Sequence, residues 1–234
     1  MKKLSKAKKR EIRRFMVLGL SVVIITAALI SIGYKIIMAF YIHAHKETDT
    51  VSIDYSEYNV PKPDIIDMLL TKNKNSRPGI ALKNVNGIVI HYTANPGTDA
   101  EANRNYFEGR KNEADISANK VSSHFIIGID GKIIQCIPLN EIAYASNDRN
   151  TDTISIECCH PDSSGKFSKK TYSSLVHLSA WLCGKFHLGR ADIIRHYDVT
   201  GKMCPLYYVK HEDAWLSLKK SIWKYFLRYK TNSK

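Results

Sequence analysis

The sequence predicts an α/β (mixed) protein with a central mixed β-sheet flanked by helices, preceded by one N-terminal transmembrane helix. Three observations lead to this fold class. Short apolar stretches rich in β-branched residues alternate with stretches of helical periodicity, which is typical of a sheet covered by helices. Asp130-Gly131 separates two apolar stretches and indicates an antiparallel hairpin. Near the N-terminus, 20 consecutive residues carry no charge.

The N-terminal 41 residues predict a membrane anchor. Residues 1–14 contain eight Lys or Arg and one Glu, and residues 15–34 contain no charged side chain. Twenty helical residues span about 30 Å, the thickness of the hydrocarbon core of a bilayer. We therefore expect a cytoplasmic segment over 1–14, a single-pass anchor in the cell membrane over 15–41, and an extracellular remainder. A cleaved signal peptide is the alternative.

Residues 42–74 are polar and contain Pro61 and Pro63, which predicts an extracellular tether, with a short helix over residues 64–70. Residues 75–234 predict one folded domain. Apolar and β-branched content predicts its strands over residues 85–93, 122–129, 132–136, 153–159 and 191–195. Helical spacing predicts its helices over residues 98–109, 169–187 and 215–229, the first opened by a capping box and turning Ala102, Tyr106 and Phe107 inward.

Composition narrows the class of partner. The net charge is +13 at pH 7, and no acid follows Asp213 in the lysine-rich C-terminal stretch. Such charge favours an anionic polymer or lipid. The sequence shows no helix-turn-helix, RNA-binding signature or basic-aromatic stripe, so a nucleic acid is not expected. The five cysteines are an odd number without the spacing of a disulfide framework, and buried free thiols are favoured over disulfides.

Two histidines and one cysteine are distinguished by their positions. His91 ends an apolar strand, His196 follows another, and Cys204 comes after a turn at Gly201. Two imidazoles and a thiolate make a three-ligand zinc site with an open fourth position, which is typical of catalytic rather than structural zinc. Each histidine taken singly is more often an ordinary core or surface residue. The prediction of Zn²⁺ as cofactor depends on the three occurring together.

Two further residues fit the chemistry of such a site. Glu157 lies near the end of the stretch ISIECC, where alternation places it on the same face as Ser155. A carboxylate there is a candidate general base, and a solvated side chain at the end of a strand is the alternative. Lys202 comes two residues before Cys204. It is a candidate for stabilising a developing oxyanion, although solvation is the usual state of a lysine.

Four stretches of the sequence resemble one family. IVIHYTANPGTDAEANRNYF, SSHFIIGIDGKIIQCIPLNEIAYAS, ISIECC and RHYDVTGKMCP, in this order over roughly residues 80–215, are similar to the zinc-dependent N-acetylmuramoyl-L-alanine amidases of type 2. That family also includes phage amidase endolysins and peptidoglycan recognition proteins. The resemblance implies a mixed sheet with flanking helices, an amidase catalytic domain over 75–234, zinc ligation by His91, His196 and Cys204, and catalytic roles for Glu157 and Lys202.

The resemblance also implies a substrate and shows two departures. The implied activity is cleavage of the amide between the N-acetylmuramoyl lactyl group and L-alanine of the stem peptide of peptidoglycan; a non-catalytic peptidoglycan-binding module is the alternative. Ser123 stands where many relatives have a tyrosine, which shifts weight onto Glu157. Bacterial relatives often carry a histidine where this chain reads AYAS, so Tyr144 is a candidate replacement contact. Asn95 and His124 are further candidate substrate-binding residues, and His124 could equally be core.

Overall fold

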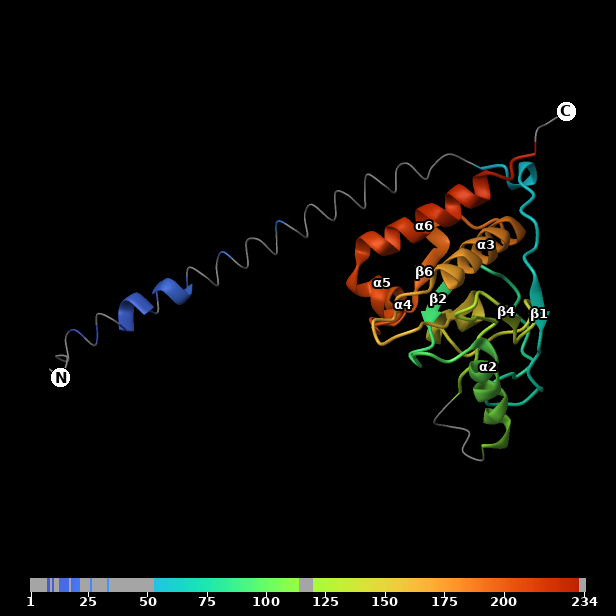
Figure 1. Ribbon diagram of the computed structural model, residues 1–234, viewed down its shortest axis with the longest axis horizontal. Coiled ribbons are helices and arrows are strands. Elements are labelled where there is room, and N and C mark those ends of the chain that lie inside the picture. The colour runs from blue at the N-terminus through green and yellow to red at the C-terminus, as the bar shows by residue number, and fades with distance from the viewer. Residues whose placement is uncertain are drawn as a thin grey trace. The chain divides into compact units, whose positions relative to one another are not determined.

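The computed structural model describes residues 53–113 and 120–231, together with residues 8, 10, 13–16, 18–21, 26 and 33. The chain divides into two compact units, Met1–Ser52 and Ile53–Lys234. The second unit contains the sheet and every element named below (Figure 1).

The predicted transmembrane helix is the part of the fold class that the structure contradicts. Most of residues 15–41 lie outside the described residues. Within the part of the chain that is described, no helix is both long and apolar enough to cross a membrane, which takes about 20 apolar residues in one helix. This finding overturns the expected single-pass anchor, the membrane as a partner, and the cell-membrane localisation with an extracellular domain that was built on them.

The second unit is organised by one six-stranded mixed sheet with the order β1-β4-β3-β5-β2-β6. Strands β3, β5, β2 and β6 run parallel to one another, β4 is antiparallel to β3, and β1 is parallel to β4. The carboxyl ends of four strands therefore meet at one edge of the sheet. The strands are β1 (Ile65–Asp67), β2 (Ile88–Tyr92), β3 (Phe125–Ile127), β4 (Ile133–Gln135), β5 (Ile154–Cys158) and β6 (Ile193–Arg195).

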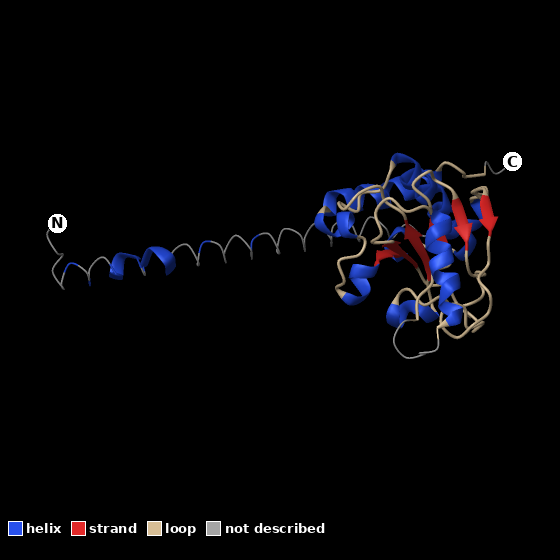
Figure 2. Ribbon diagram, turned by 60° about the horizontal axis from the view of Figure 1, so that its bottom comes forward, coloured by secondary structure: helices blue, strands red, loops and turns tan. Residues whose placement is uncertain are grey.

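Helices cover both faces of this sheet, and Figure 2 shows the strands enclosed between them. Helices α3 and α6 pack against each other on one side, and α2 lies on the other. The helices are α2 (Ala100–Gly109), α3 (Lys169–Phe186), α4 (His196–Thr200), α5 (Leu206–Lys210) and α6 (Glu212–Leu227). Four 3-10 helices complete the described elements: Tyr55–Glu57, Arg110–Asn112, Asn147–Thr151 and Arg190–Asp192.

Two apolar clusters form the core, one on each face. The larger cluster contains one face of β5, formed by Ile154, Ile156 and Cys158, together with residues of α3 and α6. The smaller cluster includes Phe107 of α2 and Cys159, which points to the opposite face. This division follows from the two-residue repeat of a strand. All five cysteines are buried free thiols, as the sequence favours.

Most elements expected in the folded domain are confirmed, with small differences in their ends. Helix α2 begins after Asp99, whose side chain accepts a hydrogen bond from Ala102 N at 2.7 Å. The inner face of α2 is formed by Ala100, Asn103 and Phe107, whereas the predicted Ala102 and Tyr106 are exposed. The hairpin at Asp130-Gly131 is present as β3 and β4.

Residues 53–74, which were expected to belong to a tether, are part of the second unit. The short helix predicted over residues 64–70 is wrong, because this segment forms β1 and pairs with β4. Leu70 is only 1% exposed and belongs to the smaller core cluster. Glu57 holds the C-terminal end of the unit: its carboxylate lies 3.0 Å from Lys230 Nζ, and its carbonyl accepts from Thr231 N at 2.6 Å.

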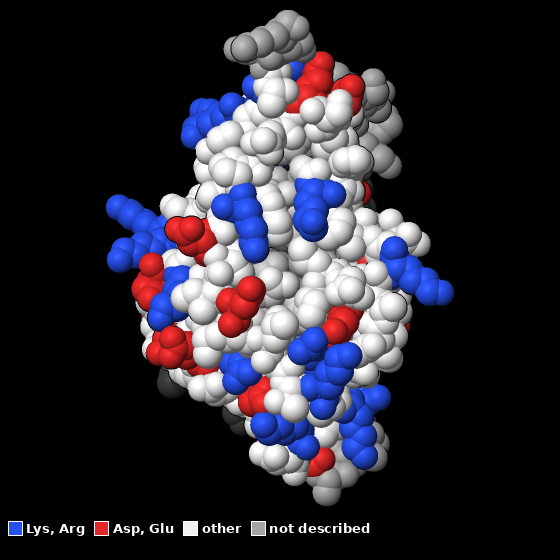
Figure 3. Space-filling view, turned by 90° about the vertical axis from the view of Figure 1, so that its right-hand side faces the viewer, with Lys and Arg blue, Asp and Glu red and all other residues white. Residues whose placement is uncertain are grey.

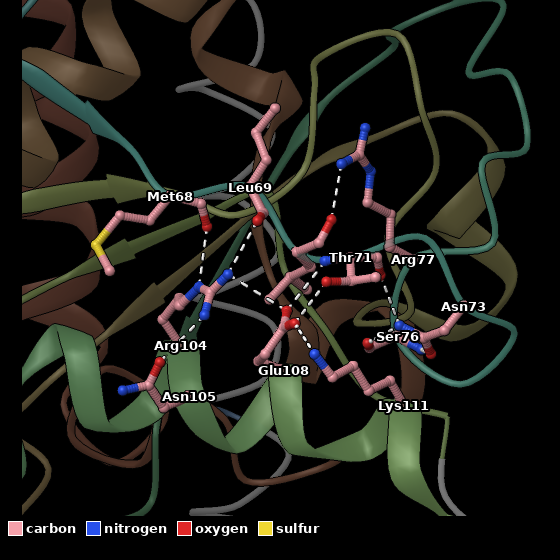
Figure 4. A network of polar contacts seen from close by, with 11 residues as sticks. Met68, Leu69, Thr71, Asn73, Ser76, Arg77, Arg104, Asn105, Glu108 and Lys111 are labelled. Carbon is pink, nitrogen blue, oxygen red and sulfur yellow. Dashed lines mark hydrogen bonds and ion pairs between the residues drawn. The ribbon is translucent and has the colours of Figure 1, made fainter.

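A polar network attaches the segment after β1 to helix α2 (Figure 4). Arg104 donates to the carbonyl oxygens of Met68 and Leu69 at 3.0 and 2.9 Å. Glu108 accepts from both the amide and the hydroxyl of Thr71, at 3.0 and 2.7 Å, and from Lys111 Nζ at 2.7 Å. Partial burial acts to raise the pKa of Glu108, but the hydrogen bonds from Lys111 and Thr71 outweigh it and hold the pKa at about 2.

Glu108→Gln should lower stability at neutral pH and make the remaining stability less sensitive to acid. Hydrogen bonds to a charged group contribute about 1.5–3 kcal/mol, and Gln cannot reproduce all of them. Because the folded pKa of Glu108 is depressed, its contribution is present above the unfolded pKa and disappears as pH falls from about 5 to about 2. Urea denaturation at several pH values should show that the difference in unfolding free energy between the two proteins decreases over that range.

The matched control for this prediction is Glu101→Gln, on the same helix. The Glu101 side chain is 52% exposed and pairs only across 3.2 Å with an exposed lysine, Lys132. Exposed pairs of this kind contribute at most about 1 kcal/mol, so this variant should track the wild type at every pH. If the difference in unfolding free energy between Glu108→Gln and wild type does not change with pH, the charge of the Glu108 carboxylate does not contribute to the stability of the network.

The basic character of the chain is not gathered on the face shown in Figure 3, where Lys and Arg alternate with Asp and Glu. Among the described residues several charges are paired, for example Arg77 with Glu141 at 2.8 Å and Lys111 with Glu108 at 2.7 Å. Binding of an anionic polymer through the basic C-terminal stretch therefore stays a prediction.

Candidate metal centre and active-site groove

The centre of the site is built by two neighbouring parallel strands. His91 of β2 and Glu157 of β5 are register partners near the carboxyl ends of their strands. Alternation points both side chains away from the larger core cluster, since Ile90 and Ile156 occupy that side. His91 is 2% exposed, and its Nδ1 lies 4.0 Å from Glu157 Oε1. The sheet thus places an imidazole beside a carboxylate at the edge where ligand sites of parallel sheets form.

The other two ligand candidates come from the segment after β6. His196 is the first residue of α4, which ends at Gly201 with a φ of 77°. This left-handed turn, which glycine adopts without strain, reverses the chain. Tyr197 N then donates to Cys204 O at 2.9 Å, so the segment folds back on α4 and brings Cys204 beside His196.

The three predicted ligands converge. One ligand atom from each of His91, His196 and Cys204 lies within 4.8 Å of the others, and all three residues are buried. Cys204 Sγ is 3.8 Å from His91 Nδ1, and the two imidazole rings have centroids 4.7 Å apart. A group of this composition and spacing can hold a metal ion.

Burial dominates the electrostatics of the cluster. Desolvation, followed by the nearby His196 and Lys202, lowers the pKa of His91 well below its usual value, and desolvation with Lys202 lowers that of His196. Both imidazoles are therefore neutral and able to donate a lone pair. Desolvation raises the pKa of Cys204 to about 12 and that of Glu157 to about 8. A bound divalent cation would favour the thiolate and the carboxylate, because opposite charge stabilises the ionised form.

These residues form the floor of a groove of about 610 Å³. Its charged lining residues are Lys120, Lys202 and Glu157, so the groove is lined by two cations and one partly buried acid. Helix α2 forms one wall with Asn103, Tyr106 and Phe107, and the remaining described lining residues are His91, Tyr92, Thr93, Ala94, Val121, Tyr144, Ala145, Asn147, Asn150, His196 and Cys204. The excess of positive charge in this lining favours a ligand that carries negative charge.

The three predicted substrate contacts have different positions. Tyr144 lines the groove, with Lys120 Nζ 5.3 Å from its ring centre. Asn95 is exposed beyond β2, outside the lining, and its carbonyl accepts from the Thr98 hydroxyl at 2.7 Å. His124 is 1% exposed and belongs to the interior, where Nδ1 accepts from Ser155 N at 3.0 Å and Nε2 donates to Glu141 O at 2.9 Å.

Sequence reasoning missed a loop that touches both imidazoles. Ser146 Oγ lies 3.1 Å from His91 Nε2, and Asn147 Oδ1 lies 2.9 Å from His196 Nε2. This segment was noted in the sequence because it lacks the histidine that bacterial relatives often carry there. The residue selected as a candidate contact was Tyr144, and not Ser146 or Asn147. Nothing in a loop without periodicity indicates which residues reach a strand far away in the sequence.

A mixed sheet whose parallel strands end at a buried His, His, Cys cluster beside a carboxylate defines an α/β protein with a candidate catalytic metal site. The chain belongs to the N-acetylmuramoyl-L-alanine amidase family, whose model matches residues 81–206.

Individual relatives agree with this assignment. The chain is 36% identical over 163 residues to the N-acetylmuramoyl-L-alanine amidase CwlL of Bacillus licheniformis, and 33% identical over 171 residues to BlyA of Bacillus subtilis strain 168. Each match covers 64% of this chain and 44% of the relative, so the chain spans less than half the length of these two proteins. A solved mutant endolysin from Bacillus subtilis is 31% identical with a TM-score of 0.55, covering 68% of this chain and 98% of that one.

Proposed function

We propose that the chain is a zinc-dependent peptidoglycan hydrolase that cleaves the amide between the lactyl group of N-acetylmuramic acid and L-alanine of the stem peptide. The observation that carries this proposal is the convergence of His91, His196 and Cys204 beside Glu157 on the floor of the groove. Membership in the amidase family supports the choice of bond.

The donor set fits zinc. Neutral imidazole and cysteine thiolate are ligand types of catalytic zinc sites, which use three protein ligands and leave the fourth position to water or substrate. Two buried oxygens at the groove, Glu157 Oε2 and Thr93 Oγ1, have no hydrogen-bond partner among the described residues. Buried polar atoms rarely stay unsatisfied, so the site is arranged for a ligand or water that supplies partners.

The proposed roles follow from position and charge. When bound, zinc would polarise the carbonyl oxygen and favour loss of a proton from water. Glu157 accepts the proton of the attacking water and passes it to the leaving amine nitrogen. Lys202, which lines the groove, stabilises the negative charge that develops on the carbonyl oxygen. Ser123 offers no substitute for Glu157, because it is fully buried and its hydroxyl donates to Phe125 O at 2.8 Å.

The direct test is digestion of purified peptidoglycan by the full chain, followed by mass spectrometry of the products. The proposal expects stem peptides with a free L-alanine amino group, glycan strands with intact lactyl groups, and one equivalent of zinc in the protein. A chelator should abolish release, and added zinc should restore it. Binding of peptidoglycan by the zinc-loaded protein without any release of peptide would favour the binding module instead.

A further inference from the structure

Consecutive residues of one loop, Ser146 and Asn147, form hydrogen bonds with the two candidate histidine ligands. His91 turns Nδ1 toward Cys204 Sγ, at 3.8 Å, and Nε2 toward Ser146 Oγ, at 3.1 Å. His196 Nε2 lies 2.9 Å from Asn147 Oδ1. An amide oxygen only accepts, so His196 carries its proton on Nε2 and keeps the lone pair of Nδ1 for the cluster.

The loop is itself fixed. Asn150 Oδ1 accepts from the amides of Ala145 and Ser146 at 2.9 and 2.6 Å, which holds the backbone just before Asn147. Asn147 has a φ of 52°, a left-handed conformation that asparagine tolerates better than most residues. Downstream, the Thr153 hydroxyl donates to Arg149 O at 2.5 Å. Ser146 is 1% exposed, so its hydroxyl meets little competition from water.

We propose that Ser146 and Asn147 are positioning residues of the metal centre. The Asn147 amide oxygen selects the Nε2-protonated tautomer of His196, and the Ser146 hydroxyl, which can donate to or accept from Nε2, fixes the orientation of the His91 ring, so that Nδ1 of each ring is left for the metal. The inference rests on the metal site of the proposed function and adds the residues that orient it. A free imidazole exchanges between two tautomers and rotates about its bonds to the backbone. Hydrogen bonds at Nε2 of each ring restrict this freedom before a metal ion binds.

One loop acting on both ligands has a further effect. Ser146 and Asn147 are adjacent, so neighbouring residues of one loop carry the two oxygens that contact the imidazoles. The two imidazoles, which come from β2 and α4, are therefore placed relative to each other as well as to the sheet. Loss of either hydrogen bond should weaken metal binding without removing a ligand.

The test measures zinc affinity of the full chain by competition with a chromophoric chelator. Asn147→Gly removes the acceptor and leaves the positive φ unstrained, and Ser146→Ala removes the other oxygen. Each should weaken zinc binding by about 10–100-fold, the usual effect of losing a partner of a metal-bound histidine. Asn147→Asp keeps an acceptor and should bind zinc no more weakly than wild type. Asp148→Gly, a like truncation at the next position of the loop, is the matched control and should not change the affinity.

A second measurement reads the tautomers without any metal. In ¹⁵N-histidine spectra of the zinc-free chain, wild type should show the Nε2-protonated form for His196, because the Asn147 amide oxygen can only accept. Asn147→Gly should shift His196 toward a mixture of tautomers. Tight zinc binding by wild type, with unchanged zinc affinity in both variants and an unchanged His196 tautomer in Asn147→Gly, would overturn the positioning role and leave the proposed function standing. Failure of wild type itself to bind zinc would overturn the metal site.

Discussion

Glu157→Gln is expected to lower turnover of peptidoglycan by about 10²–10⁴-fold while zinc content stays close to that of the wild type. General acid-base catalysis contributes a factor of that size, which corresponds to about 3–5 kcal/mol in activation free energy. Gln preserves the shape of the side chain and one oxygen but cannot accept the water proton. Steady-state kinetics on purified peptidoglycan, with metal analysis of the same samples, measures both quantities.

The structure explains why no neighbour should replace Glu157. Ser123 and His124 are buried with their polar atoms engaged, and His124 lies outside the groove. Lys202 lines the groove but brings a positive charge rather than a base. Glu101→Gln, an exposed acid on α2, is the control and should retain full turnover. If Glu157→Gln keeps more than about a third of wild-type turnover, Glu157 does not carry the proton.

Cys204→Ser should reduce zinc affinity by more than about 100-fold, because loss of a direct ligand exceeds the 10–100-fold effect of losing an outer partner. A hydroxyl is a harder and far less ionised donor than a thiol. At a fixed zinc concentration well above the wild-type Kd, a 100-fold loss removes about 2.7 kcal/mol of the stabilisation that zinc provides. Chelator competition and thermal unfolding, each with and without zinc, measure the two effects.

Cys183→Ser is the matched control, since Cys183 is also a fully buried thiol but lies in α3, away from the cluster. A buried hydroxyl in that apolar position should lower stability equally with and without zinc and leave zinc affinity unchanged. The role of Cys204 as ligand is refuted if Cys204→Ser behaves in the same way as this control.

The helices with long apolar periodicity and the candidate ligands could be predicted from the sequence. The helix expected over residues 169–187 is α3, Lys169–Phe186, because its apolar spacing and Ser168 cap are local signals. The cluster of His91, His196 and Cys204 was predictable because the two histidines follow apolar strands, Cys204 follows the turn at Gly201, and the three residue types together suit zinc. The resemblance to the amidase family implied the same three ligands.

Features defined by pairing or by tertiary contact were not predictable in the same way. Three-residue β1 exists because it pairs with β4, and its own sequence, Ile-Ile-Asp, has too few residues to show a period. Ser146 and Asn147 reach the imidazoles through a loop whose course depends on Asn150 and on the start of β5. The anchor expected over residues 15–41 was inferred from hydropathy alone, and no membrane-spanning helix occurs among the residues that the structure describes.

The two outer strands of the sheet, β1 and β6, are only three residues long each. A strand at the border of a sheet presents unpaired backbone amides and carbonyls that can recruit a strand from another molecule. Three residues offer few such groups, and Pro61 and Pro63 directly before β1 cannot donate to an added strand. The sheet is therefore poorly suited to edge-to-edge association, so its geometry disfavours polymerisation of neighbouring copies where the protein is concentrated.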